Sequence, residues 1–175
     1  MPTPLALPLP APAVVVLIGA SGAGKSTLAA ALADQDPAVA VVGYDRCREE
    51  ITGDESDQDA TERAVRLAHR RVTERCAAGL TTVVDATHTL LAHRVVLVGM
   101  ADRHHLPAVA IAVDTPLIVC LARQLDRPPR PPGARWGRRV DPRTVATQHR
   151  AVRRGLPTLH REGFASVHIL TGGHR

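Results

Sequence analysis

The fold is decided by the stretch Val14-Val15-Val16-Leu17-Ile18-Gly19-Ala20-Ser21-Gly22-Ala23-Gly24-Lys25-Ser26-Thr27. Five apolar, mostly β-branched residues run directly into Gly-x-x-x-x-Gly-Lys-Ser, and an alanine-rich segment follows at residues 28–33. This is the pattern of a phosphate-binding loop (P-loop) in the setting that it requires, with a strand before it and a helix after it. The stretch therefore predicts a nucleotide site at the end of the first strand.

Each residue type in this loop has a physical role in holding phosphate. The glycines allow backbone angles that a Cβ would forbid, so that successive N–H groups can turn around an anion. The start of the following helix adds partial positive charge and unpaired amides. Lys25 can reach the β- and γ-phosphates, and the Ser26 hydroxyl can ligate Mg²⁺. The residues expected to bind the nucleotide are Gly19, Ala20, Ser21, Gly22, Ala23, Gly24, Lys25, Ser26 and Thr27.

Composition limits the class of protein. The chain has 175 residues, of which 45% are hydrophobic, and this suits a single domain with a sizeable core. Its formal net charge of +5 suits an anionic partner without identifying one. Aromatic residues make up only 2%, too few for a platform that stacks nucleic-acid bases. Lys25 is the only lysine, so the other basic residues are all arginines.

Cysteine spacing and the N-terminal segment indicate a cytoplasmic protein. Cys47, Cys76 and Cys120 are widely spaced and show no paired pattern of zinc ligands, so we expect reduced, mostly buried thiols. Residues 1–12 are rich in proline and lack the basic start of a signal peptide. We expect a disordered lead-in there, and a P-loop domain over residues 13–171. No apolar run approaches the length of a membrane span.

Apolar patterning predicts alternating strands and helices after the loop. We expect strands at residues 13–18, 39–42, 80–88, 106–113 and 165–170, and helices at residues 25–34, 61–78, 91–103, 116–126 and 142–162. Thr115 is expected to cap the helix that begins at Pro116. Such alternation gives an α/β fold with three layers around a parallel sheet of about five strands.

Two segments do not fit a regular element. Residues 127–143 are dense in Pro, Gly and Arg and are interpreted as a mobile, arginine-rich lid. Residues 49–62 are acidic and polar, and a solvated connection is favoured over a metal-binding loop. Calcium-type loops need a fixed glycine and a terminal glutamate that this segment lacks.

Beyond the loop, the chain resembles the polynucleotide 5′-kinase modules of bacterial RNA-repair end-healing proteins and their phage relatives, within the P-loop kinases of the AAA-33-like type. The matching residues are Asp45-x-x-Arg48, Gly53-Asp54-Glu55-Ser56-Asp57-Gln58, the stretch from Ala78 to Thr87 that contains Asp85-Ala86-Thr87, Val119-Cys120-x-x-Arg123-x-x-x-Arg127, and Arg161-Glu162-Gly163-Phe164. The similarity runs from about Val15 to Leu170. It implies an ATP- and Mg²⁺-dependent kinase, with a repair ligase or phosphatase as a possible partner.

Asp45 is the candidate general base, because an aspartate just past the second strand lies within reach of a γ-phosphate held by the loop. A helix cap for residues 46–51 is the alternative for Asp45. The resemblance implies that Arg48 holds the phosphate of the acceptor. For Asp85 it implies a role in orienting that arginine, and an outer-shell Mg²⁺ carboxylate is the alternative.

Arg123 and Arg127 stand four residues apart, so one helix would project both from one face. The resemblance makes them lid arginines that clamp the donor phosphates. The remaining lid arginines have a solvated basic surface as their default interpretation. His88 is the histidine nearest to the expected site, and the histidines show no metal-ligand spacing.

Three hypotheses follow for function. The leading one is phosphoryl transfer from ATP to the 5′-hydroxyl end of RNA or DNA. The second is a P-loop kinase of a small hydroxylated molecule such as a nucleoside, sugar or antibiotic, which the low aromatic content favours. The third is a nucleotide-dependent regulatory switch, against which Asp45, Arg123 and Arg127 count. The sequence leaves open the identity of the acceptor, the preference for ATP or GTP, and the oligomeric state.

Overall fold

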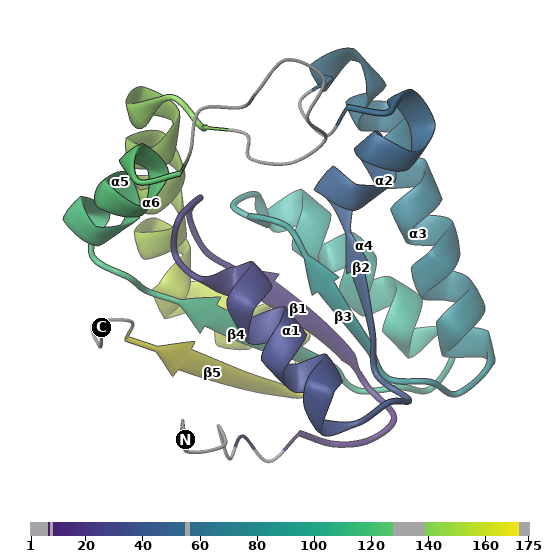
Figure 1. Cartoon of the computed structure of the whole chain (residues 1–175). Coiled ribbons are helices and arrows are strands. Elements are labelled where there is room, and N and C mark those ends of the chain that lie inside the picture. Colours follow the sequence, from purple (N-terminus) through teal and green to yellow (C-terminus); the bar gives the residue numbers. More distant parts are fainter. Residues whose placement is uncertain (1–6, 8, 55–56, 128–138, 172–175) are drawn as a thin grey trace.

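The computed structural model describes residues 7, 9–54, 57–127 and 139–171 of the chain, and within them strands and helices alternate (Figure 1). The strands are β1 (Val14–Ile18), β2 (Ala40–Gly43), β3 (Thr82–Asp85), β4 (Ala108–Val113) and β5 (Ser166–Leu170). The helices are α1 (Lys25–Gln35), α2 (Tyr44–Thr52), α3 (Thr61–Ala77), α4 (Leu91–Asp102), α5 (Leu117–Leu125) and α6 (Pro142–Gly155), with short 3₁₀ turns η1 (Gln58–Ala60) and η2 (Leu156–Arg161).

All strand pairs are parallel, and the strand order is β2-β3-β1-β4-β5. The central strand β1 lies between β3 and β4, and every one of its residues is buried. A strand covered on both faces needs a continuous apolar run, which is what Val14–Ile18 provides. The predicted α/β fold with a five-stranded parallel sheet is therefore confirmed.

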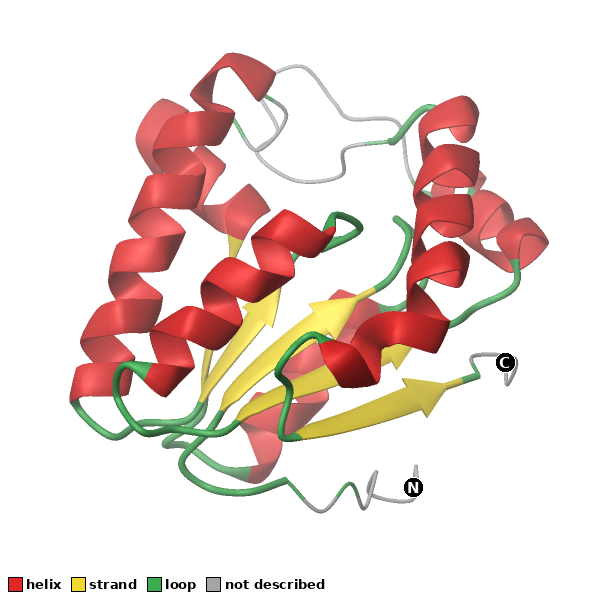
Figure 2. Ribbon diagram, turned by 180° about the vertical axis from the view of Figure 1, so that it is seen from behind, coloured by secondary structure: helices red, strands yellow, loops and turns green. Residues whose placement is uncertain are grey.

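Side chains of β1 alternate between two cores, one on each face of the sheet. Val15 and Leu17 pack with Ala29 and Leu32 of α1. Val14, Val16 and Ile18 belong to the larger core, to which α3 and α4 contribute most of the helical side chains. Figures 1 and 2 show α1 on one side of the sheet, with α5 and α6 at one lateral side and α2 and α3 at the other.

A third apolar cluster joins the P-loop to α5 and α6. It contains Ala20 and Ala23 of the loop, Val113 at the end of β4, Cys120 of α5 and Val145 of α6. The loop is therefore packed against the two helices that flank residues 128–138. The expected lid lies mostly outside the described residues, and its last two residues belong to α6, which begins at Pro142 as expected.

Helix boundaries differ from expectation where proline or a competing contact intervenes. Thr115 does not cap α5: its hydroxyl donates to the Ala23 carbonyl at 2.8 Å, and α5 begins at Leu117 after Pro116. Helix α5 ends at Leu125, so Arg127 is not on the same helix as Arg123. Arg127 precedes a proline, and the ring of a following proline disfavours the helical conformation.

Three other expected bounds are corrected by the structure. Residues 49–52 belong to α2 and not to a connection. Helix α6 stops at Gly155, two residues before Pro157, and a 3₁₀ turn continues the chain. The third strand covers only Thr82–Asp85 of the expected residues 80–88, because positive φ at His88 and the polar residues before it begin a loop.

Several smaller expectations have clear outcomes. Cys47, Cys76 and Cys120 are free and buried, as predicted. Of the N-terminal segment, the described residues Leu7 and Leu9 pack against the core that contains Val15. Within the described ranges, no helix is both long enough and apolar enough to cross a lipid bilayer.

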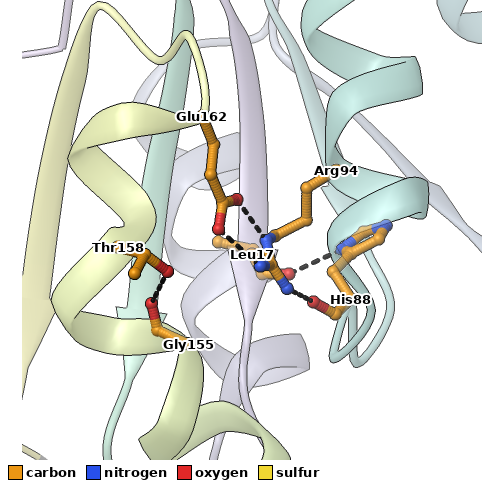
Figure 3. Close-up of polar contacts among 6 residues, drawn as sticks. All are labelled: Leu17, His88, Arg94, Gly155, Thr158 and Glu162. Carbon is orange, nitrogen blue, oxygen red and sulfur yellow. Dashed lines mark hydrogen bonds and ion pairs between the residues drawn. The ribbon is translucent and has the colours of Figure 1, made fainter.

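A buried ion pair joins the loop after β3 to the segment between η2 and β5. Glu162 accepts two hydrogen bonds of 2.6 Å from Nε and Nη2 of Arg94, and the side chains are only 5% and 4% exposed (Figure 3). Arg94 Nη1 also donates to the His88 carbonyl at 2.8 Å. His88 Nδ1 in turn lies 2.7 Å from the Leu17 carbonyl of β1. The loop that leaves β3 is thus tied both to β1 and to the segment after η2.

Glu162→Gln should destabilise the fold, because it leaves the buried Arg94 guanidinium without its counter-charge. We expect a loss of about 3–5 kcal/mol in the free energy of unfolding, measured by urea titration. Replacing both partners, as in Arg94→Met with Glu162→Leu, should restore part of this loss. The exposed pair of Arg66 and Glu62 is the control, and Glu62→Gln should cost at most about 1 kcal/mol. Equal losses for Glu162→Gln and Glu62→Gln would contradict this account.

Candidate functional site

A large cleft opens at the carboxyl ends of the parallel strands, where open α/β sheets bind their ligands. Its volume is about 1010 Å³. The cleft brings together the P-loop after β1, Asp45 and Arg48 of α2 after β2, Asp85 at the end of β3, and Arg123 with Arg127 from α5 and its extension. Each of the charged residues expected from the sequence therefore lines the same cleft.

The P-loop conformation depends on its glycines. Gly22 and Gly24 have φ angles of 85° and 103°, which residues with a Cβ rarely adopt. A Cβ at Gly22 would lie 2.5 Å from the Cys120 carbonyl oxygen, so close packing against α5 also requires glycine there. Gly24 precedes α1 without any side-chain cap. The first amides of α1 therefore keep their donors for a ligand.

Lys25 is held against the loop itself. Its Nζ donates to the Ala20 carbonyl at 2.9 Å, and the residue is 7% exposed. Burial lowers the pKa of Lys25 below its usual value, while the Asp85 carboxylate opposes that shift. A phosphate in the cleft would favour the ammonium form for the same reason that Asp85 does. Ser26 and Thr27, one and two residues further, are exposed.

On the opposite side of the cleft, Asp45 and Arg48 form an ion pair one helical turn apart. The Asp45 side chain is 63% exposed, whereas that of Arg48 is 8% exposed. Asp45 does not serve as a side-chain cap, because the cap of α2 is Gly43 and the aspartate lies in the first turn. A buried guanidinium therefore sits directly behind an accessible carboxylate. Asp85 is paired in register with Gly43, the residue immediately before α2.

The two arginines expected at the lid both line the cleft, although they belong to different segments. Arg123 of α5 donates from Nη1 to the carbonyls of Gly22 and Ala23 at 3.2 and 3.3 Å. The Arg127 carbonyl accepts a 2.8 Å hydrogen bond from Arg139, whose Nη2 donates to Leu125. The Arg139 side chain thus binds the backbone that precedes residue 128.

His88 lies at the base of the cleft and is 1% exposed. The Leu17 carbonyl can only accept, so Nδ1 of His88 carries the proton of the neutral ring. Burial lowers the pKa of His88 to about 4, and the imidazole is uncharged at neutral pH. Tyr44 packs edge-on against this ring, with centroids 5.4 Å apart, and its hydroxyl lies 3.0 Å from Nε2 of His69. Both rings therefore act as walls of the cleft.

Sequence reasoning missed three residues that contact or line this site. The Ser21 N–H donates to Gln148 Oε1 of α6 at 2.9 Å, and Thr115 holds the Ala23 carbonyl. Tyr44 lines the acceptor side beside Asp45. Gln148 could have been found as a polar residue in the apolar stripe of α6, between Val145 and Val152. The other two gave no signal in the sequence.

The residues present fit a nucleoside triphosphate with Mg²⁺. The uncapped start of α1, Lys25 and two arginines suit a polyphosphate, and an exposed Ser26 hydroxyl with nearby carboxylate oxygens suits a hard cation. In the part of the chain that the structure describes, no group of three or more His, Cys, Asp or Glu side chains could hold a metal by themselves. A cation here would need ligands from the phosphates as well.

Comparison with solved structures shows a similar fold in several proteins. A protein of Chloroflexus aurantiacus described as a candidate kinase shares 18% identity, with a TM-score of 0.69 over 93% of this chain and 89% of that chain. A chain of the Pnkp1/Rnl/Hen1 RNA repair complex shares 17% identity, with a TM-score of 0.71 over 88% of this chain and 48% of that chain. The Mycobacterium tuberculosis APS kinase CysC, in complex with AMPPNP and APS, shares 21% identity, with a TM-score of 0.54 over 67% of this chain and 71% of that chain.

No curated protein matches the sequence. A family model does: AAA_33, described as an AAA domain, matches residues 14–155, which include the P-loop, Asp45, Asp85 and both cleft arginines. This match covers more than half of the chain, and the fold agrees with it. The chain belongs to the AAA_33 family of P-loop kinases.

Proposed function

We propose that the protein transfers the γ-phosphoryl group of ATP, with Mg²⁺, to the 5′-hydroxyl end of RNA or DNA. Kinase-type phosphoryl transfer is supported by the AAA_33 family and by the P-loop. The observation that carries the acceptor side is the Asp45–Arg48 pair, an exposed carboxylate backed by a buried guanidinium across the cleft from Lys25. Such a pair suits a hydroxyl next to a phosphate.

On the donor side, the P-loop amides and Lys25 would hold the β- and γ-phosphates. Mg²⁺, when bound, neutralises charge on these phosphates, and the Ser26 hydroxyl is its ligand from the chain. Arg123 already reaches the loop at Gly22 and Ala23, so its guanidinium is close to where a γ-phosphate would lie. Arg127 also lines the cleft, and its charge adds to the lowering of the Lys25 pKa that burial causes. Both arginines would stabilise equatorial charge in the transition state.

On the acceptor side, Asp45 would accept the proton of the attacking hydroxyl and orient its oxygen toward phosphorus. Arg48 has a planar fork of N–H donors, which matches a phosphate oxygen pair better than lysine does. Burial orders this side chain before the acceptor arrives, and ordering in advance reduces the entropy lost on binding. Asp85 lies between Lys25 and the start of α2, where it could orient Arg48 or bind a water of the Mg²⁺ shell.

The likeness to the Pnkp1/Rnl/Hen1 RNA repair complex agrees with this proposal, and a repair ligase or phosphatase would be a suitable partner. Cytoplasmic location is part of the same proposal. The second candidate is a kinase of a small hydroxylated molecule. It is favoured by the small aromatic surface of the described cleft lining, in which Tyr44 is only partly exposed and packs edge-on against His88. The APS kinase likeness points the same way.

Lys25→Ala should abolish phosphoryl transfer while the protein remains folded, because Lys25 acts on phosphate and not on the sheet. The measurement is transfer of label from γ-labelled ATP, alongside thermal unfolding. A folded Lys25→Ala protein that keeps most of its activity would show that the loop is not the donor site.

Asp45→Asn should keep ATP binding and lose transfer to any hydroxyl, since the amide cannot take the proton. Arg48→Ala should instead raise KM for 5′-hydroxyl oligonucleotides and flatten the salt dependence of their binding, because one phosphate contact is lost. The charge-matched control is Arg66→Ala on α3. In the wild type, the exposed Arg66 side chain pairs with Glu62. Unchanged KM for oligonucleotides in Arg48→Ala, together with efficient phosphorylation of a neutral small molecule, would favour the second candidate.

Arg123→Ala and Arg127→Ala should each lower kcat by about 10³-fold or more, as expected for arginines that stabilise transition-state charge. Arg→Lys at either position should recover little, because the planar fork is lost. Steady-state kinetics with saturating ATP measures both. Alanine variants with the wild-type kcat would make these arginines ordinary surface charges.

A further inference from the structure

Helix α6 carries a polar side chain, Gln148, on the face that packs toward the P-loop. Val145 and Val152 are 0% and 4% exposed and lie seven residues apart, so they mark the buried stripe of the helix. Gln148 lies between them and is only partly exposed. An apolar side chain would serve packing better at this position, so a glutamine there calls for a polar partner.

The partner is the P-loop backbone. The Ser21 N–H donates to Gln148 Oε1 at 2.9 Å, across 127 residues of sequence. Because an N–H can only donate, the carbonyl oxygen of the carboxamide must face Ser21 and its NH₂ group must point away. Within the described residues, the Gln148 NH₂ group makes no hydrogen bond to another part of the protein.

This contact differs in kind from the others that the loop makes. Lys25, Arg123 and Thr115 all donate to loop carbonyls, at Ala20, Gly22 and Ala23. Gln148 alone among these side chains accepts from a loop N–H, and it comes from a different helix. The result is a carboxamide whose orientation is fixed by the loop and whose two N–H donors remain available.

The position of these donors indicates what they meet. Gln148, Ser21, Lys25, Arg123 and Arg127 all line the same cleft. A P-loop with its lysine holds the β- and γ-phosphates of a nucleotide, and Ser21 immediately precedes Gly22 in that loop. A terminal phosphate oxygen in this part of the cleft would therefore find neutral N–H donors next to cationic ones.

We infer that Gln148 is a γ-phosphate-binding residue: Ser21 fixes its Oε1, and its Nε2 donates to the terminal phosphate of the nucleotide. This inference rests on the proposed function, because it requires a nucleoside triphosphate in the P-loop. Helix α6 would then contribute to the selectivity of the site for a nucleoside triphosphate over a diphosphate. ADP has no γ-phosphate, so only ATP makes this contact.

Gln148→Glu tests the donor role separately from the contact with the loop. The glutamate keeps an oxygen acceptor for the Ser21 N–H and nearly the same shape, but it replaces the NH₂ donors by a carboxylate that repels phosphate. We expect Kd for ATP to rise about tenfold or more, with a much smaller change for ADP, so that the ratio of the two constants rises. Calorimetric titration with each nucleotide measures both constants.

Two further variants keep the test decisive. Gln35→Glu makes the same change on an exposed residue at the far end of α1, and it should leave the ratio unchanged. Gln148→Ala should raise the ratio less than Gln148→Glu, and its ratio remains measurable if Gln148→Glu fails to fold. Equal weakening of ATP and ADP, or no weakening, would overturn the inference while the proposed function stands. A folded wild type that binds neither nucleotide would overturn the proposed function and this inference with it.

Discussion

The structure depends on the close approach between the P-loop and the first turn of α5. Gly22 stands against the Cys120 carbonyl with no room for a Cβ, and its positive φ turns the loop at that point. Carbonyls of the loop are then held by Thr115 and Arg123 from the α5 segment and by Lys25 from α1. A loop whose carbonyls are engaged in this way can turn amides, such as those at the uncapped start of α1, toward an anion.

The same packing places the other charged groups. Because α5 follows β4 and α2 follows β2, the two helices stand on opposite sides of the P-loop that ends the central strand β1. Arg123 thus approaches from one side, and Asp45 with Arg48 from the other. The buried pair of Arg94 and Glu162 ties the loop after Asp85 to the segment between η2 and β5. The cleft is therefore assembled from loops at one edge of a rigid sheet, which suits in-line transfer between two bound groups.

The sheet and the P-loop could be predicted because their signals are local. A run of five apolar, mostly β-branched residues favours a strand covered on both faces, and the glycine spacing of the loop is specific. Asp45, Asp85 and Arg123 could be placed near one another because parallel strands end at the same edge. The continuation of α5 to Arg127 was wrong because the prolines that follow outweigh helical spacing. Thr115 does not cap α5 as predicted, because its hydroxyl donates to the Ala23 carbonyl.

Other features could not be predicted, because they join residues far apart in the chain. Nothing near Arg94 in the sequence indicates that Glu162 will neutralise it in the core, 68 residues away. The pairing of Ser21 with Gln148 likewise depends on how α6 packs on the loop. His88 drew attention as the histidine nearest to the site. Its burial against Leu17, which keeps it uncharged, follows from tertiary packing alone.

The central claim is that ATP held by the P-loop donates its γ-phosphoryl group to a hydroxyl held at Asp45 and Arg48. The most direct measurement is label transfer from γ-labelled ATP by the wild-type protein to three acceptors. These are an oligonucleotide with a 5′-hydroxyl end, the same oligonucleotide already phosphorylated at that end, and a neutral nucleoside. The account predicts Mg²⁺-dependent labelling of the first, none of the second and little of the third. ATP binding without label on any hydroxyl acceptor would contradict it.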